Sequence, residues 1–487
     1  MSITRRKFLG GSLAAGASLA LPASRVLGAN GDIRVAVIGF NGRGQSHISD
    51  LAKMQGVRLV ALCDVDPAVL KKSVDALGAK GIKVEAYSDL RRVFDNKDID
   101  VVTTATPNHW HSLIGIWACQ TGKDSYIEKP ISHNVWEGRQ LVKAARKYNR
   151  VVQGGTQSRS NPRLKAAVKW VQEGNLGKVK AVYGTCYKPR MSIGKVGQGE
   201  VPAGLDYGLW IGPAEMKPLT RKSLHYDWHW VYNTGNGDMG NQGIHQMDIA
   251  RWFLGVNELS PRVMSVGGRL GYDDDGETPN TQIVYHDYDK APLIFETRGL
   301  PKGKEFQEQP RMWSSNMDTP LGLAQARPIG VVVECEGGWV IDSGPAAYDK
   351  SGKLIQEFKG EERGDGHMEN FIAAVRERKP EMLNAESLET HLSSALCHTG
   401  LVSHQLGKLM GPGEIMERIK GNKLAAERFE SMKEHLGRNG VELSSQNVTL
   451  GPWLQMDPKK ERFIDNPEAN KLVTRRYREG FVVPKEV

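Results

Sequence analysis

From residue 33 onward, short apolar runs rich in β-branched residues alternate with amphipathic stretches of roughly ten to fifteen residues. Continuous apolar strands with helical segments between them are typical of a parallel sheet that is covered by helices on both faces. We therefore expect a doubly wound α/β domain over residues 30–158. Its strands are predicted at 34–38, 57–63, 99–102, 124–127 and 151–152.

After a helix predicted at 162–173, the pattern changes, because apolar strands follow one another without helices between them. Gly337-Gly338 is a hairpin signal, and a turn signal follows it at 349–352. We expect an α+β second domain over residues 159–410, built on a large, mainly antiparallel, open-faced sheet. Its strands are predicted at 179–187, 281–287 and 329–334, and its later helices, at 367–378 and 387–406, can pack back on the first domain.

Two long connections and a tail complete the pattern. The connections at 188–235 and 300–327 exceed ordinary loop lengths, which favours binding loops or flexible segments. The tail, residues 411–487, begins with a charged amphipathic helix and ends in a segment punctuated by proline. We expect it to wrap the body of the protein or a neighbouring subunit.

Length and composition narrow the class of protein. A chain of 487 residues exceeds the size of one hydrophobic core, so two domains are expected. With 39% hydrophobic and 25% charged residues, the composition excludes a multi-span membrane protein. The net charge of +9 falls to +5 without the first 29 residues, which hold four basic residues and no acid. Basic residues elsewhere are interspersed with acids, so we expect no nucleic-acid partner.

The N-terminus resembles a twin-arginine export signal. Arg5 and Arg6 precede a mildly apolar stretch at 8–21, and Gly28-Ala29 offers small residues for cleavage. The stretch is too short to span a bilayer stably. We expect residues 1–29 to be removed and the mature chain to be periplasmic or exported; a disordered basic N-terminus is the alternative. Five cysteines without a CxxC pair indicate no disulfide framework.

A glycine-rich loop follows the first strand directly and leads into a helix, as in Rossmann nucleotide-binding domains. Asn41 departs from the GxGxxG spacing, but asparagine tolerates a positive φ better than most residues. Asp64 ends the second strand, where its carboxylate can bind both ribose hydroxyls, which favours NAD. Arg43 could pair with a 2′-phosphate, so NADP stays open. The loop residues are Gly39, Phe40, Asn41, Gly42, Arg43 and Gly44.

Two further strand ends carry polar motifs, at residues 106–111 and 128–130. Together with the glycine-rich loop and residues 63–67, Cys-Asp-Val-Asp-Pro, they resemble the glucose-fructose oxidoreductase / inositol dehydrogenase / MocA (Gfo/Idh/MocA) family over residues 32–410. The resemblance implies an NAD-dependent oxidoreductase that acts on a hydroxyl of a sugar, glycoside or polyol. It also implies that the coenzyme contacts Thr106, Pro107, Asn108, His111, Glu128 and Lys129.

The resemblance extends to the second domain, where many family members carry Asp-x-Gly-x-His-x-x-Asp with an acid one helical turn before the histidine. His245 and Asp248 match, but Asn241 stands where the acid is expected. Asp238 lies on nearly the same helical face as His245 and could substitute for that acid. The resemblance implies that His245 accepts the hydroxyl proton and that Lys129 stabilises the same oxygen. In isolation, His245 would rather be a core histidine and Lys129 a surface lysine.

Aromatic residues are concentrated at 207–232, and such faces suit the apolar faces of sugar rings. Tyr226 and Trp228 are candidates for substrate binding, as are Tyr187 and Arg190 at the start of the preceding connection. Packing in a second core or an oligomer interface is an equally good interpretation of the aromatics. Two histidine pairs, at 109 and 111 and at 225 and 229, lack a third ligand, so we expect no metal site.

Three functions therefore stay open. The first is an exported oxidoreductase with tightly bound NAD; the second is an NAD-dependent glycosidase, since the family resemblance extends to α-N-acetylgalactosaminidases that cleave by transient oxidation and elimination. The third is a sugar-binding protein that has lost its chemistry, as Asn41 and Asn241 would allow. The resemblance also implies a homodimer or homotetramer.

Overall fold

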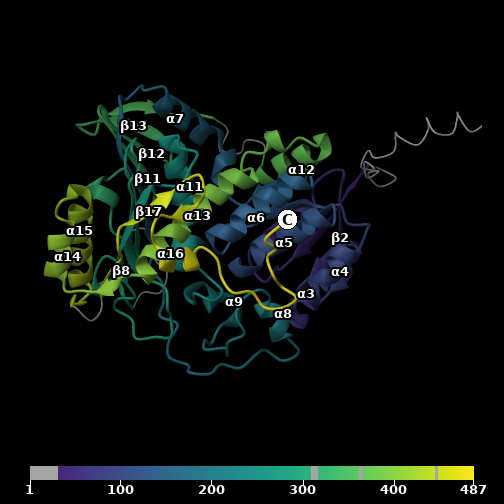
Figure 1. Cartoon of the computed structure of the whole chain (residues 1–487). Helices are drawn as coiled ribbons and strands as arrows, with labels where there is room; N and C mark the ends of the chain where they lie inside the picture. Colours follow the sequence, from purple (N-terminus) through teal and green to yellow (C-terminus); the bar gives the residue numbers. More distant parts are fainter. Residues whose placement is uncertain (1–30, 309–315, 361–365, 445–447) are drawn as a thin grey trace, which may run out of the picture.

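The computed structural model describes residues 31–308, 316–360, 366–444 and 448–487. Figure 1 shows two sheets on opposite sides of the molecule, with helices between them and a long C-terminal segment that crosses from one side to the other. The twin-arginine motif with Arg5 and Arg6 lies outside the described residues.

The first domain is built on a six-stranded sheet in which all neighbouring strands are parallel. The order β3-β2-β1-β4-β5-β6 reverses its direction between β1 and β4, and sheets of this kind bind ligands at that point, outside the carboxyl ends of the strands. The predicted doubly wound domain is confirmed. Its strands are β1 (Ile33–Ile38), β2 (Val57–Cys63), β3 (Glu85–Tyr87), β4 (Val101–Thr104), β5 (Asp124–Ile127) and β6 (Val152–Gly154).

Helices cover both faces of this sheet, as its buried strands require. One apolar core joins the sheet to α5 and α6, and another joins it to α2 and α12. Because α12 follows the large sheet in the chain, the later helices do pack back on the first domain. The helices are α2 (Gly44–Leu51), α3 (Pro67–Gly78), α4 (Leu90–Asp95), α5 (His111–Gln120), α6 (Val135–Lys147) and α12 (His367–Glu377).

The second domain holds a large mixed sheet whose main path runs β14-β13-β12-β11-β7-β10-β9-β8-β16-β15. Neighbouring strands on this path are antiparallel, except for the parallel pair β7 and β10, so the predicted large, mainly antiparallel sheet is confirmed. The strands are β7 (Val179–Tyr187), β8 (Arg262–Gly268), β9 (Thr281–His286), β10 (Leu293–Arg298), β11 (Ile329–Cys335), β12 (Gly338–Ile341), β13 (Ala346–Asp349), β14 (Leu354–Glu357), β15 (Lys408–Leu409), β16 (Thr449–Leu450), β17 (Leu454–Asp457) and β18 (Arg462–Phe463).

Side chains along these strands alternate between two apolar cores, one on each face. On β9, Val284 faces the core shared with α7, α11 and α13, whereas Ile283 and Tyr285 face the core shared with α14 and α15. The face that was expected to lie open is therefore covered where Phe429 and Met432 of α15 pack on it. The helices are α7 (Pro162–Gln172), α11 (Gly243–Leu254), α13 (Ser387–Gln405), α14 (Pro412–Ile419) and α15 (Lys423–Arg438).

The prediction of consecutive strands without helices is wrong between β7 and β8. This stretch contains α8 (Tyr207–Ile211), α9 (Leu224–Asp227), the 3-10 helix η3 (Trp228–Trp230), α10 (Gly237–Asn241) and α11. The first four are five residues long or shorter, so no helical period of apolar residues announces them.

The C-terminal tail wraps this chain's own body. Its last helix, α16 (Pro467–Leu472), joins the core of the second domain, and the chain then crosses to the first domain (yellow in Figure 1). There the ring of Phe481 lies 5.5 Å from that of Trp110 and 6.5 Å from that of Trp117, in both cases between centroids. The tail thus bridges the two domains.

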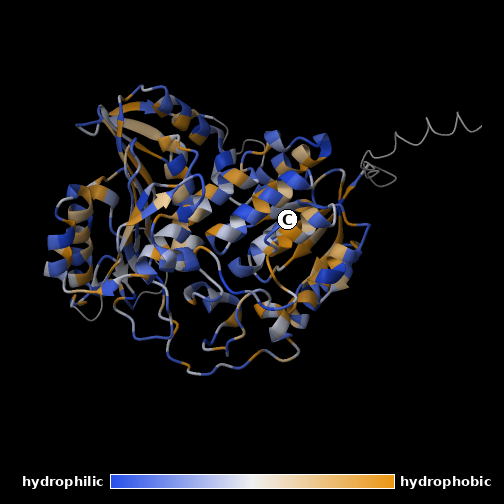
Figure 2. Cartoon of the chain, in the orientation of Figure 1, coloured by the Kyte–Doolittle hydropathy of each residue, from blue (hydrophilic) through white to orange (hydrophobic). Residues whose placement is uncertain are grey.

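The distribution of hydropathy agrees with this arrangement. In Figure 2 the strands of the first sheet are largely orange, whereas the outer faces of the helices are mostly blue or white. Among the described residues, no helix combines the length and the apolar character needed to cross a bilayer.

If the tail stabilises the fold through Phe481, replacing it should matter far more than replacing its neighbour. Phe481 is 7% exposed and Val482 is 53% exposed. We expect Phe481→Ala to lower the free energy of unfolding by about 3 kcal/mol, because it leaves a cavity beside two tryptophans. Val482→Ala is the control. Urea unfolding followed by tryptophan fluorescence measures both, and equal midpoints would contradict the role of the tail.

Candidate functional site

A cavity of about 420 Å³ lies between the two domains, where the loops that follow β1, β2, β4 and β5 face residues 209–245 of the second domain. It therefore sits at the point predicted for ligand binding by the topology of the first sheet. Many predicted site residues line it together: Gly39, Phe40, Asn41, Gly42, Arg43, Asp64, Thr106, Pro107, Asn108, His111, Glu128, Lys129, Tyr226, Trp228, Asn241 and His245.

The glycine-rich loop is shaped for a close approach of its backbone to a ligand. Gly39 has a φ of +72°, which glycine adopts without steric cost, and Asn41 has no positive φ, so the turn does not depend on asparagine. A Cβ at Gly44 would lie 2.3 Å from the carbonyl oxygen of Gly39, whereas nothing lies within 4 Å of a Cβ at Gly42. Gly44 thus packs the turn, and Gly42 leaves the N-terminus of α2 open to a pyrophosphate.

The end of β2 fits a ribose. The carboxylate of Asp64 accepts hydrogen bonds from the main-chain N–H groups of Phe40 at 3.1 Å and Asp66 at 3.0 Å, which fix its position. Burial raises the pKa of Asp64 above its usual value. Arg43 donates instead to Glu128, with Nε 2.9 Å from Oε1. The cation that could bind a 2′-phosphate is therefore already paired, which fits a nucleotide with a free 2′-hydroxyl.

Two of the predicted coenzyme residues connect the loops around the cavity. The His111 ring lies between two carbonyl oxygens, with Nδ1 2.6 Å from that of Pro130 and Nε2 2.7 Å from that of Thr106. Asn108 donates through Nδ2 to Oδ1 of Asn236 at 3.0 Å and so reaches the second domain. These contacts fix the positions of the two strand-end loops relative to each other and to the second domain.

Lys129 bridges the domains at the cavity wall. Its Nζ donates to the main-chain carbonyl oxygen of Asn241 at 2.6 Å. Burial lowers the pKa of Lys129, while the nearby charge of Glu128 acts in the opposite direction and favours the ammonium form. Asn241 therefore serves through its backbone, so this contact does not require an acid at position 241.

His245 lies in the first turn of α11 and is half-buried in the same wall. Among the described residues, no side chain or backbone group hydrogen-bonds its ring. Burial and the charge of Lys129 lower the pKa of His245 to about 3, whereas Glu128 and Asp248 favour the charged ring. Near pH 7 the imidazole is therefore neutral and has a free lone pair.

The two acids considered as partners of His245 bind arginines instead. Asp238 accepts hydrogen bonds from Arg190, with Oδ2 2.9 Å from Nε and Oδ1 2.5 Å from Nη2. Asp248 accepts from Nε of Arg159 at 2.9 Å. The expectation that Asp238 replaces the missing acid is therefore not met by a contact, because its carboxylate is already occupied. Neither acid lines the cavity.

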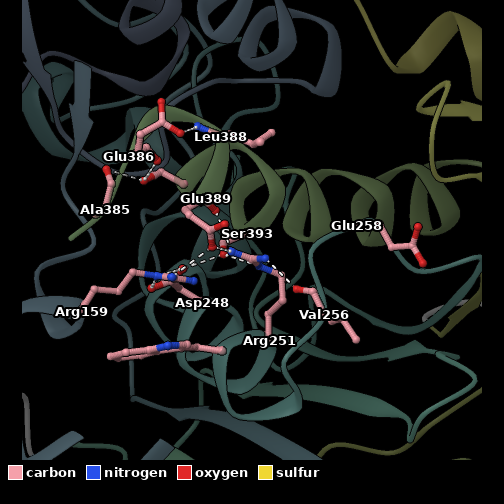
Figure 3. A network of polar contacts seen from close by, with 12 residues as sticks. Arg159, Asp248, Arg251, Val256, Glu258, Ala385, Glu386, Leu388, Glu389 and Ser393 are labelled. Carbon is pink, nitrogen blue, oxygen red and sulfur yellow. Dashed lines mark hydrogen bonds and ion pairs between the residues drawn. The ribbon is translucent and has the colours of Figure 1, made fainter. Parts of the chain in front are cut away.

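Asp248 belongs to a buried network beneath the site (Figure 3). Ser393 of α13 donates to its Oδ1 at 2.7 Å, and Arg251 donates through Nε to Ser393 at 3.0 Å. Glu389 then joins both arginines, with Oε2 3.0 Å from Arg159 Nη1 and 2.6 Å from Arg251 Nη2. Since His245 stands one helical turn before Asp248, the network fixes the helix that carries it.

Of the four substrate candidates outside the catalytic pair, two line the cavity and two do not. Tyr226 and Trp228 line it, and the hydroxyl of Tyr226 accepts a hydrogen bond from Arg190 Nη1 at 3.0 Å. Arg190 thus lies behind the wall, between Tyr226 and Asp238. Tyr187 is not brought to the cavity at all, because its hydroxyl donates at 2.8 Å to Glu296 within the large sheet.

The connection after β7, residues 188–236, crosses to the first domain, and we call it the strap. His225 of the strap has Nε2 2.8 Å from Oδ2 of Asp66, at the end of β2. The carbonyl oxygen of Trp210 accepts from Nε1 of Trp110 at 3.0 Å. Leu209, Trp210, His225 and His229 all line the cavity. The sequence marks this segment only through its aromatic residues and its length.

Other lining residues carry no signal in the sequence; they include Ser88, Leu90 and Gln157. In the described ranges, no three His, Cys, Asp or Glu side chains are grouped as metal ligands would be. His225 and His229, which have helical zinc spacing, contact Asp66 and the carbonyl oxygen of Tyr226 instead.

Comparison with protein families gives matches to both domains. Residues 33–156 match the model GFO_IDH_MocA, described as an oxidoreductase family with an NAD-binding Rossmann fold. Residues 164–312 match GFO_IDH_MocA_C2, the C-terminal alpha/beta domain of the oxidoreductase family.

Curated relatives match about a quarter of this chain. A protein of Shewanella pealeana named "Glycosyl hydrolase family 109 protein" is 33% identical over 121 residues, or 23% of this chain. A relative with the same name from Shewanella woodyi is 33% identical over 118 residues. The chain spans 26% and 25% of the length of these two relatives.

Solved structures share the fold over most of the chain. The WlbA dehydrogenase of Bordetella pertussis, in complex with NADH and UDP-GlcNAcA, has a TM-score of 0.54 at 19% identity and covers 75% of this chain and 94% of its own. A levoglucosan dehydrogenase in complex with NADH has a TM-score of 0.55 at 18% identity and covers 76% of this chain and 97% of its own.

The network of Figure 3 should be essential for stability. Arg159→Met leaves the carboxylate of Asp248, whose side chain is 1% exposed, without its arginine. We expect the free energy of unfolding to fall by about 3 kcal/mol or more, because a buried charge loses its partner. Lys169→Met, which breaks a solvent-exposed pair on α7, should change it by less than about 0.5 kcal/mol. Urea unfolding measures the free energy of unfolding of both variants. Similar losses in Arg159→Met and Lys169→Met would contradict the role of the network.

Proposed function

Since this chain belongs to the Gfo/Idh/MocA oxidoreductase family, we propose that it uses NAD to oxidise a hydroxyl group of a sugar, glycoside or polyol. One observation carries the proposal: Lys129 and His245, from different domains, line the same cavity as the glycine-rich loop. A coenzyme held at one end of this cavity and a hydroxyl compound at the other would meet between these two side chains.

The residues that would hold the coenzyme are those of the first domain. The open N-terminus of α2 at Gly42 would bind the pyrophosphate, and Asp64 would bind the ribose hydroxyls. When bound, the nicotinamide accepts the hydride that leaves the substrate carbon. Tyr226 and Trp228 then remain to face the apolar side of a sugar ring.

The proton chemistry falls to the two residues at the domain boundary. His245 is neutral, and none of the residues that the structure describes hydrogen-bonds its ring, so it can accept the hydroxyl proton. The ammonium group of Lys129 can donate to the same oxygen and stabilise the negative charge that develops on it. The charges of Glu128 and Asp248 favour the protonated ring of His245 during the transfer.

The proposed role of Lys129 predicts a loss of chemistry without loss of the nucleotide. Lys129→Met replaces the lysine by an unbranched side chain of similar length that carries no charge. We therefore expect turnover of the best glycoside in a panel to fall at least about a hundredfold. Nicotinamide absorbance and formation of keto-sugar measure turnover, and nucleotide content is measured after denaturation.

Lys169→Met, which changes an exposed lysine, should retain wild-type turnover. Unchanged turnover in Lys129→Met would remove the proposed role. A wild-type protein that binds both nucleotide and sugar but transfers no hydride would instead support the non-catalytic alternative.

We also propose that the coenzyme is retained between turnovers, because the strap closes over the cavity and is fixed to the first domain by His225. Removing that contact with His225→Asn should accelerate release of bound NAD roughly fivefold, as expected for about 1 kcal/mol. Lys217→Met, which breaks an exposed pair on the same strap, should not. The protein is dialysed against an apo-dehydrogenase that captures released NAD, and the NADH that this enzyme then forms is followed by its fluorescence. Equal release rates in the wild type and His225→Asn would contradict the proposed role of the contact between His225 and Asp66.

An NAD-dependent glycosidase is a second candidate, favoured by the partial match to glycosyl hydrolase family 109 proteins. In that case the oxidation would be transient, and the aglycone would leave by elimination. Release of a free aglycone without net NADH would select this candidate over the first.

Two further features stay proposals. Export by the twin-arginine route rests on residues outside the described part of the chain. A homodimer or homotetramer would need an interface other than the part of the large sheet that α14 and α15 cover.

A further inference from the structure

His229 is a histidine of the cavity that the proposed oxidation does not use. It belongs to η3 on the strap, is half-buried and lines the same cavity as Lys129 and His245. Its ring stacks on Trp228, with centroids 3.6 Å apart and planes 22° apart. His111 and His225 also line the cavity, but the His111 ring contacts two carbonyl oxygens and His225 pairs with Asp66. The two remaining imidazoles of the cavity come from α11 and the strap.

The hydrogen bond of His229 fixes its tautomer. Nδ1 lies 2.5 Å from the main-chain carbonyl oxygen of Tyr226, and a carbonyl can only accept, so Nδ1 carries the hydrogen. Nε2 then keeps its lone pair, and within the described ranges no group hydrogen-bonds it. A fixed ring whose lone pair has no partner among the described residues can accept a proton from a bound substrate.

The backbone around His229 is also held in place. Thr234 donates through Oγ1 to the carbonyl oxygen of Trp228 at 2.9 Å. A Cβ at Gly235 would lie 2.6 Å from the carbonyl oxygen of His229 and 2.7 Å from its Cα, so only glycine allows the turn to pack this closely. The position of the ring is thus determined on both sides.

The charges that face His229 keep it neutral. Burial, together with the cations Lys129 and Arg190, lowers its pKa to about 3, while Asp238 acts in the opposite direction. Lys129 lines the same cavity as both rings, and its charge also lowers the pKa of His245. An oxygen bound by Lys129 would therefore share this cavity with two neutral imidazoles.

We propose that His229 transfers a proton to and from the carbon next to the carbonyl group that the oxidation creates. This inference rests on the proposed function, which supplies the ketone. Nε2 takes the proton from the adjacent C–H, the electron pair of that bond forms a C=C bond, the π pair of the C=O bond moves to the oxygen, and Lys129 stabilises the resulting enolate. The proton returns to the same carbon, so the step is redox-neutral and balanced. Where the next carbon carries a glycosidic oxygen, the enolate can expel it instead.

Deuterium exchange tests the inference. The purified protein with its coenzyme is incubated in D₂O with methyl and 4-nitrophenyl glycosides, and the recovered glycoside is examined by mass spectrometry and NMR. A hydride held by a nicotinamide does not exchange with solvent, so deuterium beside the oxidised carbon reports proton transfer. We expect incorporation with the wild type and a loss of at least about a hundredfold in His229→Asn, which keeps a donor for Tyr226 but lacks the base.

The ratio of exchange to coenzyme reduction in the same variant separates the two claims. It should fall at least about thirtyfold, because a general loss of substrate binding would lower both rates together. Added imidazole should partly restore exchange in His229→Ala, which a purely structural role would not allow. His225→Asn is the matched control: its coenzyme content is expected to fall, but the ratio of exchange to oxidation should equal that of the wild type.

A second readout does not depend on turnover. In the holoenzyme labelled with ¹⁵N-histidine, the His229 signals, assigned by their absence in His229→Asn, should show a protonated Nδ1 and an unprotonated Nε2. The opposite tautomer would overturn the inference, as would oxidation without exchange or exchange that persists in His229→Asn and His229→Gln. If no glycoside reduces the bound coenzyme, the proposed function fails and this inference with it.

Discussion

One hydrogen bond across the domain boundary joins the two catalytic elements of the site: the Lys129 ammonium donates to the main-chain carbonyl oxygen of Asn241. A partly buried cation is costly without an acceptor, and the carbonyl at the end of α10 is the acceptor of Lys129. Because α11 follows immediately, the same contact sets the distance between the first domain and the helix that carries His245. The cavity exists because these two elements meet in this way.

Other contacts keep the two domains in that relation. The buried network of Arg159 and Asp248 ties α11 to α13, α12 packs on the first sheet, and the tail places Phe481 against Trp110. Each is built from a segment distant in sequence, so domain opening would break several of them together. Substrates are therefore expected to enter beside the strap rather than through separation of the domains, and the strap itself carries side chains of the cavity.

The sequence predicts the parts of this structure that depend on local patterns. The strands at 57–63, 124–127 and 179–187 are found with those bounds, and most of their residues are buried. It does not predict β3, whose residues 85–87 are largely exposed, or the short helices of the strap. The role of Asn241 also escapes prediction, because its contact is made by the backbone and no side-chain pattern reports it. Likewise, the arginines that occupy Asp238 and Asp248 come from residues 48 and 89 positions away.

The arrangement of charges explains how one cavity could serve both oxidation and proton exchange. In an alcohol the hydroxyl oxygen gains negative charge as its proton leaves, and in an enolate the same oxygen carries that charge. A lysine placed at this oxygen stabilises both states without moving. The two neutral histidines then act on different hydrogens, His245 on the O–H and His229 on the adjacent C–H, because they approach from different elements, α11 and the strap. Whether the protein can exchange the C–H proton in addition to oxidising the alcohol thus depends on His229, which the strap places in the same cavity as Lys129.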